Sequence, residues 1–106
     1  MKLDENYKLV IKSLELLAAP YEEQKRCLPK FADVPDDVVS NFENSFLLLP
    51  VLVEEGRFSN HAIASLLRVY NKMQWCLRNI ELDDFGNEEW NKLRELSNIT
   101  LKSIGV

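Results

Sequence analysis

Residues that commonly build catalytic or metal sites are scarce in this chain. It has one histidine, His61, and two cysteines, Cys27 and Cys76, which do not form a Cys-x-x-Cys pair. Structural zinc is usually held by four Cys or His side chains, so we expect no metal site. We expect both thiols to be free and buried, as is usual in a reducing compartment.

Glycine and long apolar runs are also scarce. The chain has three glycines and no Asn-Gly or Asp-Gly dipeptide, so it lacks the strongest signal for a β-hairpin. The longest apolar run, residues 46–53, contains Pro50 and is far shorter than the roughly 20 residues of a membrane-spanning helix. Asp4 and Glu5 near the start argue against a secretory signal. We therefore expect a cytoplasmic protein that does not bind a membrane.

Basic residues are outnumbered by acidic ones. The sequence has 13 Lys and Arg against 17 Asp and Glu, a net charge of −4. Nucleic acids and anionic membranes are bound mainly through basic surfaces, so both are disfavoured as partners. Residues 57–73 could form one helix of a helix-turn-helix, but the basic residues there are too widely spread for a recognition helix. The charge balance favours a basic protein partner instead.

Apolar residues recur at three- and four-residue spacing along most of the chain, which predicts helices. A hydrophobic content of 46% with 28% charged residues is typical of a globular protein. We predict an all-α fold, a compact single-domain bundle of five or six helices over residues 1–106. The residues expected to face its core are Tyr7, Val10, Ile11, Leu14, Leu17, Ala18, Val38, Val39, Phe42, Phe46, Leu49, Val53, Ile63, Leu66, Leu67, Tyr70, Met73, Leu77, Trp90, Leu93, Ser97, Leu101 and Ile104.

Prolines and aspartates predict the helix ends in the first half. Pro20 ends the first helix and opens a short second helix over residues 21–28. Residues 30–35 are expected to form a corner. Asp33 or Asp36 then caps a third helix that begins near Asp36.

Similar signals divide the second half. Pro50 is expected to kink or split the third helix, because proline removes a hydrogen bond and clashes with the preceding turn. Gly56 ends that helix, and Ser59 or Asn60 caps the fourth. The fifth helix follows a polar loop and ends at Gly105.

No arrangement of residues suggests catalysis. His61 stands beside a predicted helix cap, and no serine or cysteine is marked as a nucleophile with an orienting acid. The neighbouring carboxylate pairs point about 100° apart on a helix, so they do not share one acid–base site. Phosphate-binding and dinucleotide-binding motifs are missing. We expect a protein that is not an enzyme and needs no cofactor.

The most uneven charge lies at residues 81–89, which contain five acids and no base. One interpretation is a partner-binding loop, in which Phe85 anchors a basic protein. The other is a solvated connector, in which Phe85 packs into the core and the acids cap the last helix. The residues predicted to bind a partner are Glu81, Asp83, Asp84, Phe85, Glu88 and Glu89, with a second acidic group of Asp33, Asp36, Asp37 and Glu43.

Residues 22–45, EEQKRCLPKFADVPDDVVSNFENS, resemble a segment of small all-helical bacterial immunity proteins. The matching positions here are Gln24, Leu28, Pro29, Phe31, Val34, Pro35, Asp36, Val38 and Phe42, followed by Glu55, Gly56, Phe58 and Ser59, and finally by Trp90, Leu93, Leu96, Leu101 and Gly105. The chain departs from that pattern at Asp37, where the family more often carries glutamate. The resemblance covers most of the chain, and its positions look architectural.

The resemblance implies an antidote of a polymorphic toxin or contact-dependent growth inhibition system. Such a protein binds the C-terminal toxin domain of a neighbouring cell and blocks it. Many of those toxins are nucleases with basic surfaces, which suits an acidic antidote. Each antidote matches its own toxin, so interface residues do not transfer from the family. We expect a monomer when free, and the alternative function is a helical adaptor or anti-activator that binds a host regulatory protein.

Overall fold

The chain folds into helices joined by short turns. The computed structural model describes the backbone of residues 2–28 and 33–106, and the side chains from residue 4 onward within those ranges. Of the corner predicted at residues 30–35, residues 30–32 lie outside them. The helices are α1 (Lys2–Ala18), α2 (Tyr21–Cys27), α3 (Val34–Phe46), α4 (Leu49–Glu54), α5 (Asn60–Asn79), the 3₁₀ helix η1 (Leu82–Asp84) and α6 (Glu88–Ile104). These residues contain no strand, which confirms the all-α prediction.

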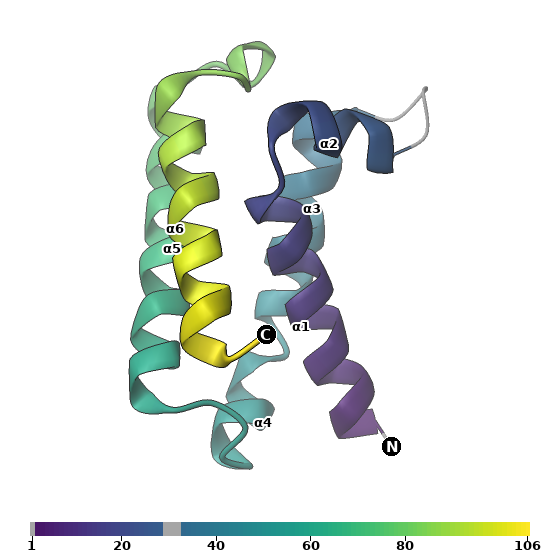
Figure 1. The fold of residues 1–106 in the computed structure, drawn as a ribbon, viewed down its shortest axis with the longest axis vertical. Coiled ribbons are helices and arrows are strands. Elements are labelled where there is room, and N and C mark those ends of the chain that lie inside the picture. Colours follow the sequence, from purple (N-terminus) through teal and green to yellow (C-terminus); the bar gives the residue numbers. More distant parts are fainter. Residues whose placement is uncertain (1, 29–32) are drawn as a thin grey trace.

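Four long helices run alternately up and down (Figure 1). Helix α1 packs against α3 and α6, and α6 packs against α5. The short α2 and the connection between α5 and α6 lie at one end of the bundle, and α4 lies at the other (Figure 1). The described part measures 38 × 25 × 21 Å. This arrangement puts segments that are distant in sequence at the same end.

The core follows the predicted helical stripes, with one exception. Val10, Leu14, Phe42, Leu66 and other apolar side chains from all four long helices form one buried cluster. Leu67 was expected to face inward, but it is 49% exposed. Adjacent helical residues point about 100° apart, so the inward position of Leu66 turns Leu67 outward.

Helix α3 begins at Val34, two residues earlier than predicted. Asp33 caps it, because the Asp33 carboxylate accepts a hydrogen bond from the backbone N–H of Asp36 at 3.3 Å. Pro35 is therefore in the first turn, where a missing N–H costs nothing. The observed start lies half a helical turn from the start predicted near Asp36, and the cap at Asp33 is confirmed.

Pro50 splits the predicted third helix in two. Helix α3 ends at Phe46 and α4 begins at Leu49, with a turn in which the Leu48 N–H donates to the Ser45 carbonyl at 2.9 Å. Pro50 has no N–H to donate to the preceding turn, so a continuous helix would leave that bond unmade. The predicted break is confirmed, with Pro50 in the first turn of α4.

Gly56 closes α4 in the left-handed conformation, with φ of 70°. Its N–H donates to Val53, and the next N–H, of Arg57, donates to Leu52. This is the hydrogen-bond pattern of a Schellman motif. We expect Gly56→Ala to lower the unfolding free energy by about 1 kcal/mol in urea denaturation, because an L side chain is strained at positive φ. Gly56→Asn should cost less, since asparagine tolerates this conformation; equal losses would contradict the explanation.

Candidate functional site

The two acidic groups predicted from sequence meet at one end of the bundle. Asp33 and Asp83 line the same shallow pocket, together with Tyr21, Pro35 and Leu82. Helix α3 also packs against η1. We call this surface the acidic end and define its acids as Asp33, Asp36, Asp37, Glu81, Asp83 and Asp84.

The acidic end is rich in unpaired acids, although Arg78 lies beside Glu81. None of its six acids forms an ion pair with a basic side chain in the described part of the chain. Five of them are exposed, and Asp37 is half-buried. Leu82 lies among them with 41% of its surface exposed. The surface therefore offers negative charge around one accessible apolar side chain.

Phe85 does not belong to this surface. It is 1% exposed, and its ring centroid lies 5.6 Å from that of Tyr21 and 4.6 Å from that of Trp90. The interpretation of Phe85 as a partner-binding anchor is therefore wrong for this conformation, because its neighbours already enclose it. Its place in the core agrees with the alternative interpretation.

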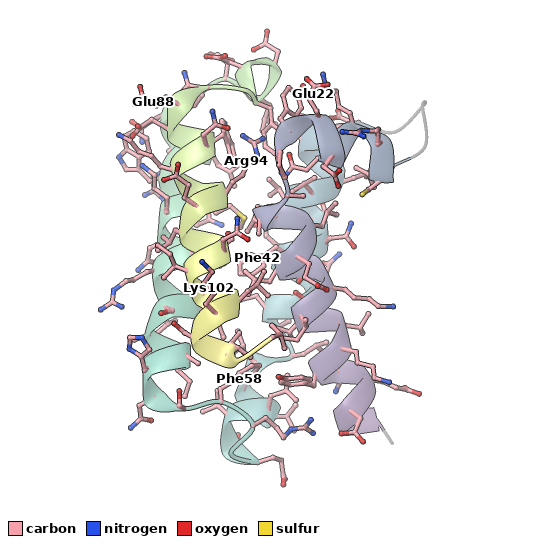
Figure 2. All side chains as sticks on the ribbon, in the orientation of Figure 1. Glu22, Phe42, Phe58, Glu88, Arg94 and Lys102 are labelled. Atoms are coloured by element: carbon pink, nitrogen blue, oxygen red, sulfur yellow. The ribbon has the colours of Figure 1, made fainter. Side chains whose placement is uncertain are left out.

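A buried arginine forms hydrogen bonds to the backbone of the connection between α5 and α6 and to α2. Arg94 of α6 is 5% exposed and lies on the side of α6 that faces α1 and α2 (Figure 2). Its Nη2 donates to the Phe85 carbonyl at 2.8 Å and to Gln24 Oε1 at 3.0 Å. Its Nη1 donates to Asn91 Oδ1 at 2.8 Å. Gln24, fully buried on α2, donates in turn to the carbonyl of Leu16 at the end of α1 at 3.0 Å.

The Arg94 charge is balanced by dipoles and aromatic rings. No carboxylate in the described residues bonds to it. Its Cζ lies 4.7 Å from the Phe85 ring centroid and 5.3 Å from that of Tyr21, within the range of a cation–π interaction. Burial lowers the pKa of Arg94 by desolvating the charged form. These hydrogen bonds thus join α1, α2, α6 and the connection between α5 and α6 (the acidic connection) around one guanidinium.

Three of the predicted acids are not part of the acidic end as defined above. Glu43 accepts a hydrogen bond from Gln74 of α5 at 3.2 Å and is half-buried. Glu89 pairs with Lys92 at 2.7 Å and with Lys72 at 3.0 Å. The hydrogen bonds from Lys92 and then Lys72 lower the pKa of Glu89. The third, Glu88, is exposed in the first turn of α6.

The cap of α6 differs from the expectation for a solvated connector. Asn87 caps the helix, and its Oδ1 accepts a hydrogen bond from the backbone N–H of Glu89 at 2.8 Å. The acids of the connection are therefore not needed as caps. Asp84 Oδ2 accepts a hydrogen bond from Nδ2 of the capping Asn87 at 2.9 Å, whereas Glu81 and Asp83 are exposed without a part in the cap.

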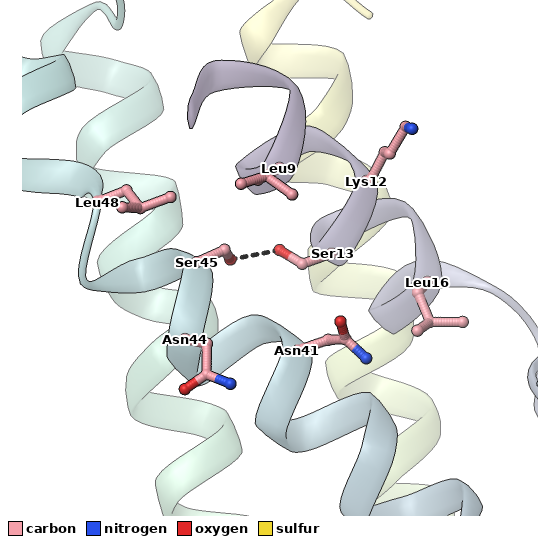
Figure 3. Close-up of a pocket in the computed structure, with 8 residues that line it drawn as sticks. All are labelled: Leu9, Lys12, Ser13, Leu16, Asn41, Asn44, Ser45 and Leu48. Carbon is pink, nitrogen blue, oxygen red and sulfur yellow. Dashed lines mark hydrogen bonds between the residues drawn. The ribbon is translucent and has the colours of Figure 1, made fainter. Parts of the chain in front are cut away.

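A separate groove lies between α1 and α3 (Figure 3). Its volume is about 330 Å³. The hydroxyls of Ser13 and Ser45 hydrogen-bond to one another where the helices cross. Its lining consists of Leu9, Lys12, Ser13, Leu16, Asn41, Asn44, Ser45 and Leu48. That lining has no histidine, thiol or carboxylate, and its charged side chain is that of Lys12.

The remaining candidate residues have ordinary surroundings. His61 is exposed in the first turn of α5. Both cysteines are free, but only Cys76 is buried, and the prediction of a buried Cys27 was wrong because it ends α2 on the exposed side. Burial raises the pKa of the Cys76 thiol. Within residues 2–28 and 33–106, no cluster of three His, Cys, Asp or Glu residues could hold a metal ion, and no helix could cross a membrane.

Comparison with known proteins gives no identification. No protein family, curated protein or solved structure matches this chain.

Proposed function

We propose that this chain is an immunity protein that binds and neutralises a basic toxin domain through its acidic end. The observation that carries the proposal is that Asp33 and Asp83, from the two acidic segments at residues 33–37 and 81–84, line one pocket. No described basic residue forms an ion pair with the acids of either segment. The resemblance of residues 22–45 to immunity proteins supports it. The helical fold is compatible with it, since a rigid bundle presents a preformed surface at small ordering cost.

The acids and Leu82 have separate parts in the proposed complex. Exposed carboxylates steer a basic domain toward the surface and raise its association rate, with modest gain in final affinity. Leu82 can bury its apolar surface against the partner once the two have met. The antidote then blocks the toxin by covering its substrate-binding surface, which is basic in a nuclease.

The direct test is rescue from the toxin. The gene for this chain should stand beside a gene for a large secreted protein. The C-terminal domain of that secreted protein should arrest growth when it is expressed alone. Co-expression of this chain should restore growth, and the two proteins should co-purify. Failure to bind that domain, or rescue by the chain without binding, would contradict the proposal.

The acidic end should control the speed of complex formation. We expect a variant with Asp33→Asn, Asp36→Asn, Glu81→Gln and Asp83→Asn to associate at least tenfold more slowly at low salt. The difference should shrink at high salt, because screening removes the steering. Stopped-flow association with the toxin domain measures both effects. Asparagine at position 33 can still cap α3, so the fold should be kept.

A matched variant controls for total charge. Glu15→Gln, Glu54→Gln, Glu55→Gln and Glu95→Gln remove the same number of charges from exposed positions elsewhere. If both variants slow association equally, only the net charge matters and the acidic end is not the binding site.

A further inference from the structure

The outward side of α5 differs from the acidic end in its charge and in its large exposed apolar side chains. Leu67 is 49% exposed and Trp75 is 39% exposed, although both are large and apolar. Helical spacing puts them on one side of α5 with other outward residues. We define this α5 outer face as Ala64, Leu67, Arg68, Asn71, Trp75 and Arg78, of which all but Ala64 are exposed. It extends for about 20 Å at 1.5 Å per residue.

The α5 outer face is positively charged on an acidic protein. Helix α5 contains Arg68, Lys72 and Arg78 and no acidic residue. Arg68 and Arg78 form no ion pair with any described residue. The nearby acid Glu89 forms ion pairs with Lys72 and Lys92 and not with either arginine. Glu81 lies beyond the C-terminal end of α5, beside Arg78.

Trp75 is held in place by its neighbours. The ammonium of Lys72 lies 4.3 Å from the Trp75 ring centroid, and Glu89 of α6 holds that ammonium at 3.0 Å. The indole is thus oriented before any partner arrives, which lowers the entropy cost of binding through it. Tryptophan and arginine are the residues most enriched among interface hot spots.

We propose that the α5 outer face binds an acidic amphipathic helix of a partner protein. The carboxylates of such a helix complement Arg68 and Arg78, and its apolar side contacts Leu67 and Trp75. These two residues are two turns apart, a spacing that matches apolar residues at every third or fourth position of a partner helix. This site is separate from the acidic end, so it does not depend on the function proposed above.

Nucleic acid fits the same face less well. Two unpaired arginines neutralise few phosphates, and the affinity of such binding rests on the number of phosphate contacts. The exposed Leu67 has no partner on DNA except a thymine methyl group.

A peptide library provides the test. A phage-displayed library of 16-residue peptides is selected on the wild-type protein, after removal of peptides that bind the Trp75→Ala variant. The surviving peptides should be rich in Asp and Glu, with Leu or Phe at helical spacing. Synthetic copies should bind wild type at least tenfold more tightly than they bind Trp75→Ala, as measured by fluorescence anisotropy. They should bind Arg68→Gln/Arg78→Gln at least threefold more weakly, with a smaller dependence on salt.

Controls separate this face from general charge effects. Lys8→Gln/Lys12→Gln removes two exposed lysines from α1 and should leave peptide binding unchanged. Circular dichroism must show that each variant is folded, and Leu67→Ser gives a second reading if Trp75→Ala is unstable. The proposal is overturned if no peptide survives, if the survivors are basic, or if they bind all variants equally. Tighter binding of a 20-base-pair DNA duplex at this face, or dimerisation lost on Trp75→Ala in sedimentation, would also overturn it.

Discussion

Replacing Arg94 by alanine is expected to lower the unfolding free energy by about 3–5 kcal/mol, the range for a buried charged group that loses its partners or leaves them unpaired. The Phe85 carbonyl and Gln24 Oε1 both lose a charged donor in that variant. The buried guanidinium also fills space against Tyr21 and Phe85. Urea denaturation measures the loss, and heating should show a lower midpoint.

Two further variants make the explanation specific. Arg94→Lys keeps the charge but has no planar fork to reach Gln24 and Phe85 together, so it should recover only part of the loss. Arg68→Ala removes an exposed arginine and should change stability by less than about 0.5 kcal/mol. If Arg94→Ala and Arg68→Ala had similar effects, the network would contribute nothing beyond surface charge.

Helical periodicity places Arg94 on the buried side of its helix, although Arg94 was not among the residues expected to face the core. Position 94 is four residues after Trp90 and three before Ser97, so it belongs to the buried side of α6. A basic residue at such a position must find partners in the core. Its partner Gln24 is distant in sequence, and no local pattern identifies which polar residue will meet it. Periodicity thus finds the buried position, but only the packed structure finds the hydrogen bonds.

Helix ends were predicted well where one residue decides them locally. Ser59 caps α5 through its hydroxyl, and Pro50 breaks the helix before it, because capping and proline sterics act within one turn. Leu67 and Cys27 were misplaced, since neighbouring apolar residues compete for the same inward position and spacing does not rank them. The meeting of residues 33–37 with 81–84 depends on topology. In an alternating bundle, the turns after the first and third long helices lie at the same end.

The acidic connection contains one buried apolar residue, Phe85, and one exposed apolar residue, Leu82. We expect the first to matter for stability and the second for binding. We expect Phe85→Ala to lower the unfolding free energy by about 3–5 kcal/mol, because it removes a buried ring and leaves a cavity beside Trp90 and Tyr21. Leu82→Ala, at an exposed position, should cost less than about 1 kcal/mol. Urea denaturation of both variants provides the comparison.

Affinity for the toxin domain should depend on Leu82 more than on Phe85. Leu82→Ala stays folded and should weaken affinity for the basic toxin domain about tenfold, because an apolar side chain at the centre of an interface can contribute over 1 kcal/mol. Phe85→Leu keeps most of the buried volume, so it should bind nearly as well as wild type while remaining folded. Titration calorimetry on the folded variants measures both affinities. If Phe85→Leu lost binding and Leu82→Ala did not, Phe85 would have to leave the core to contact the toxin, and the rigid acidic end proposed here would be wrong.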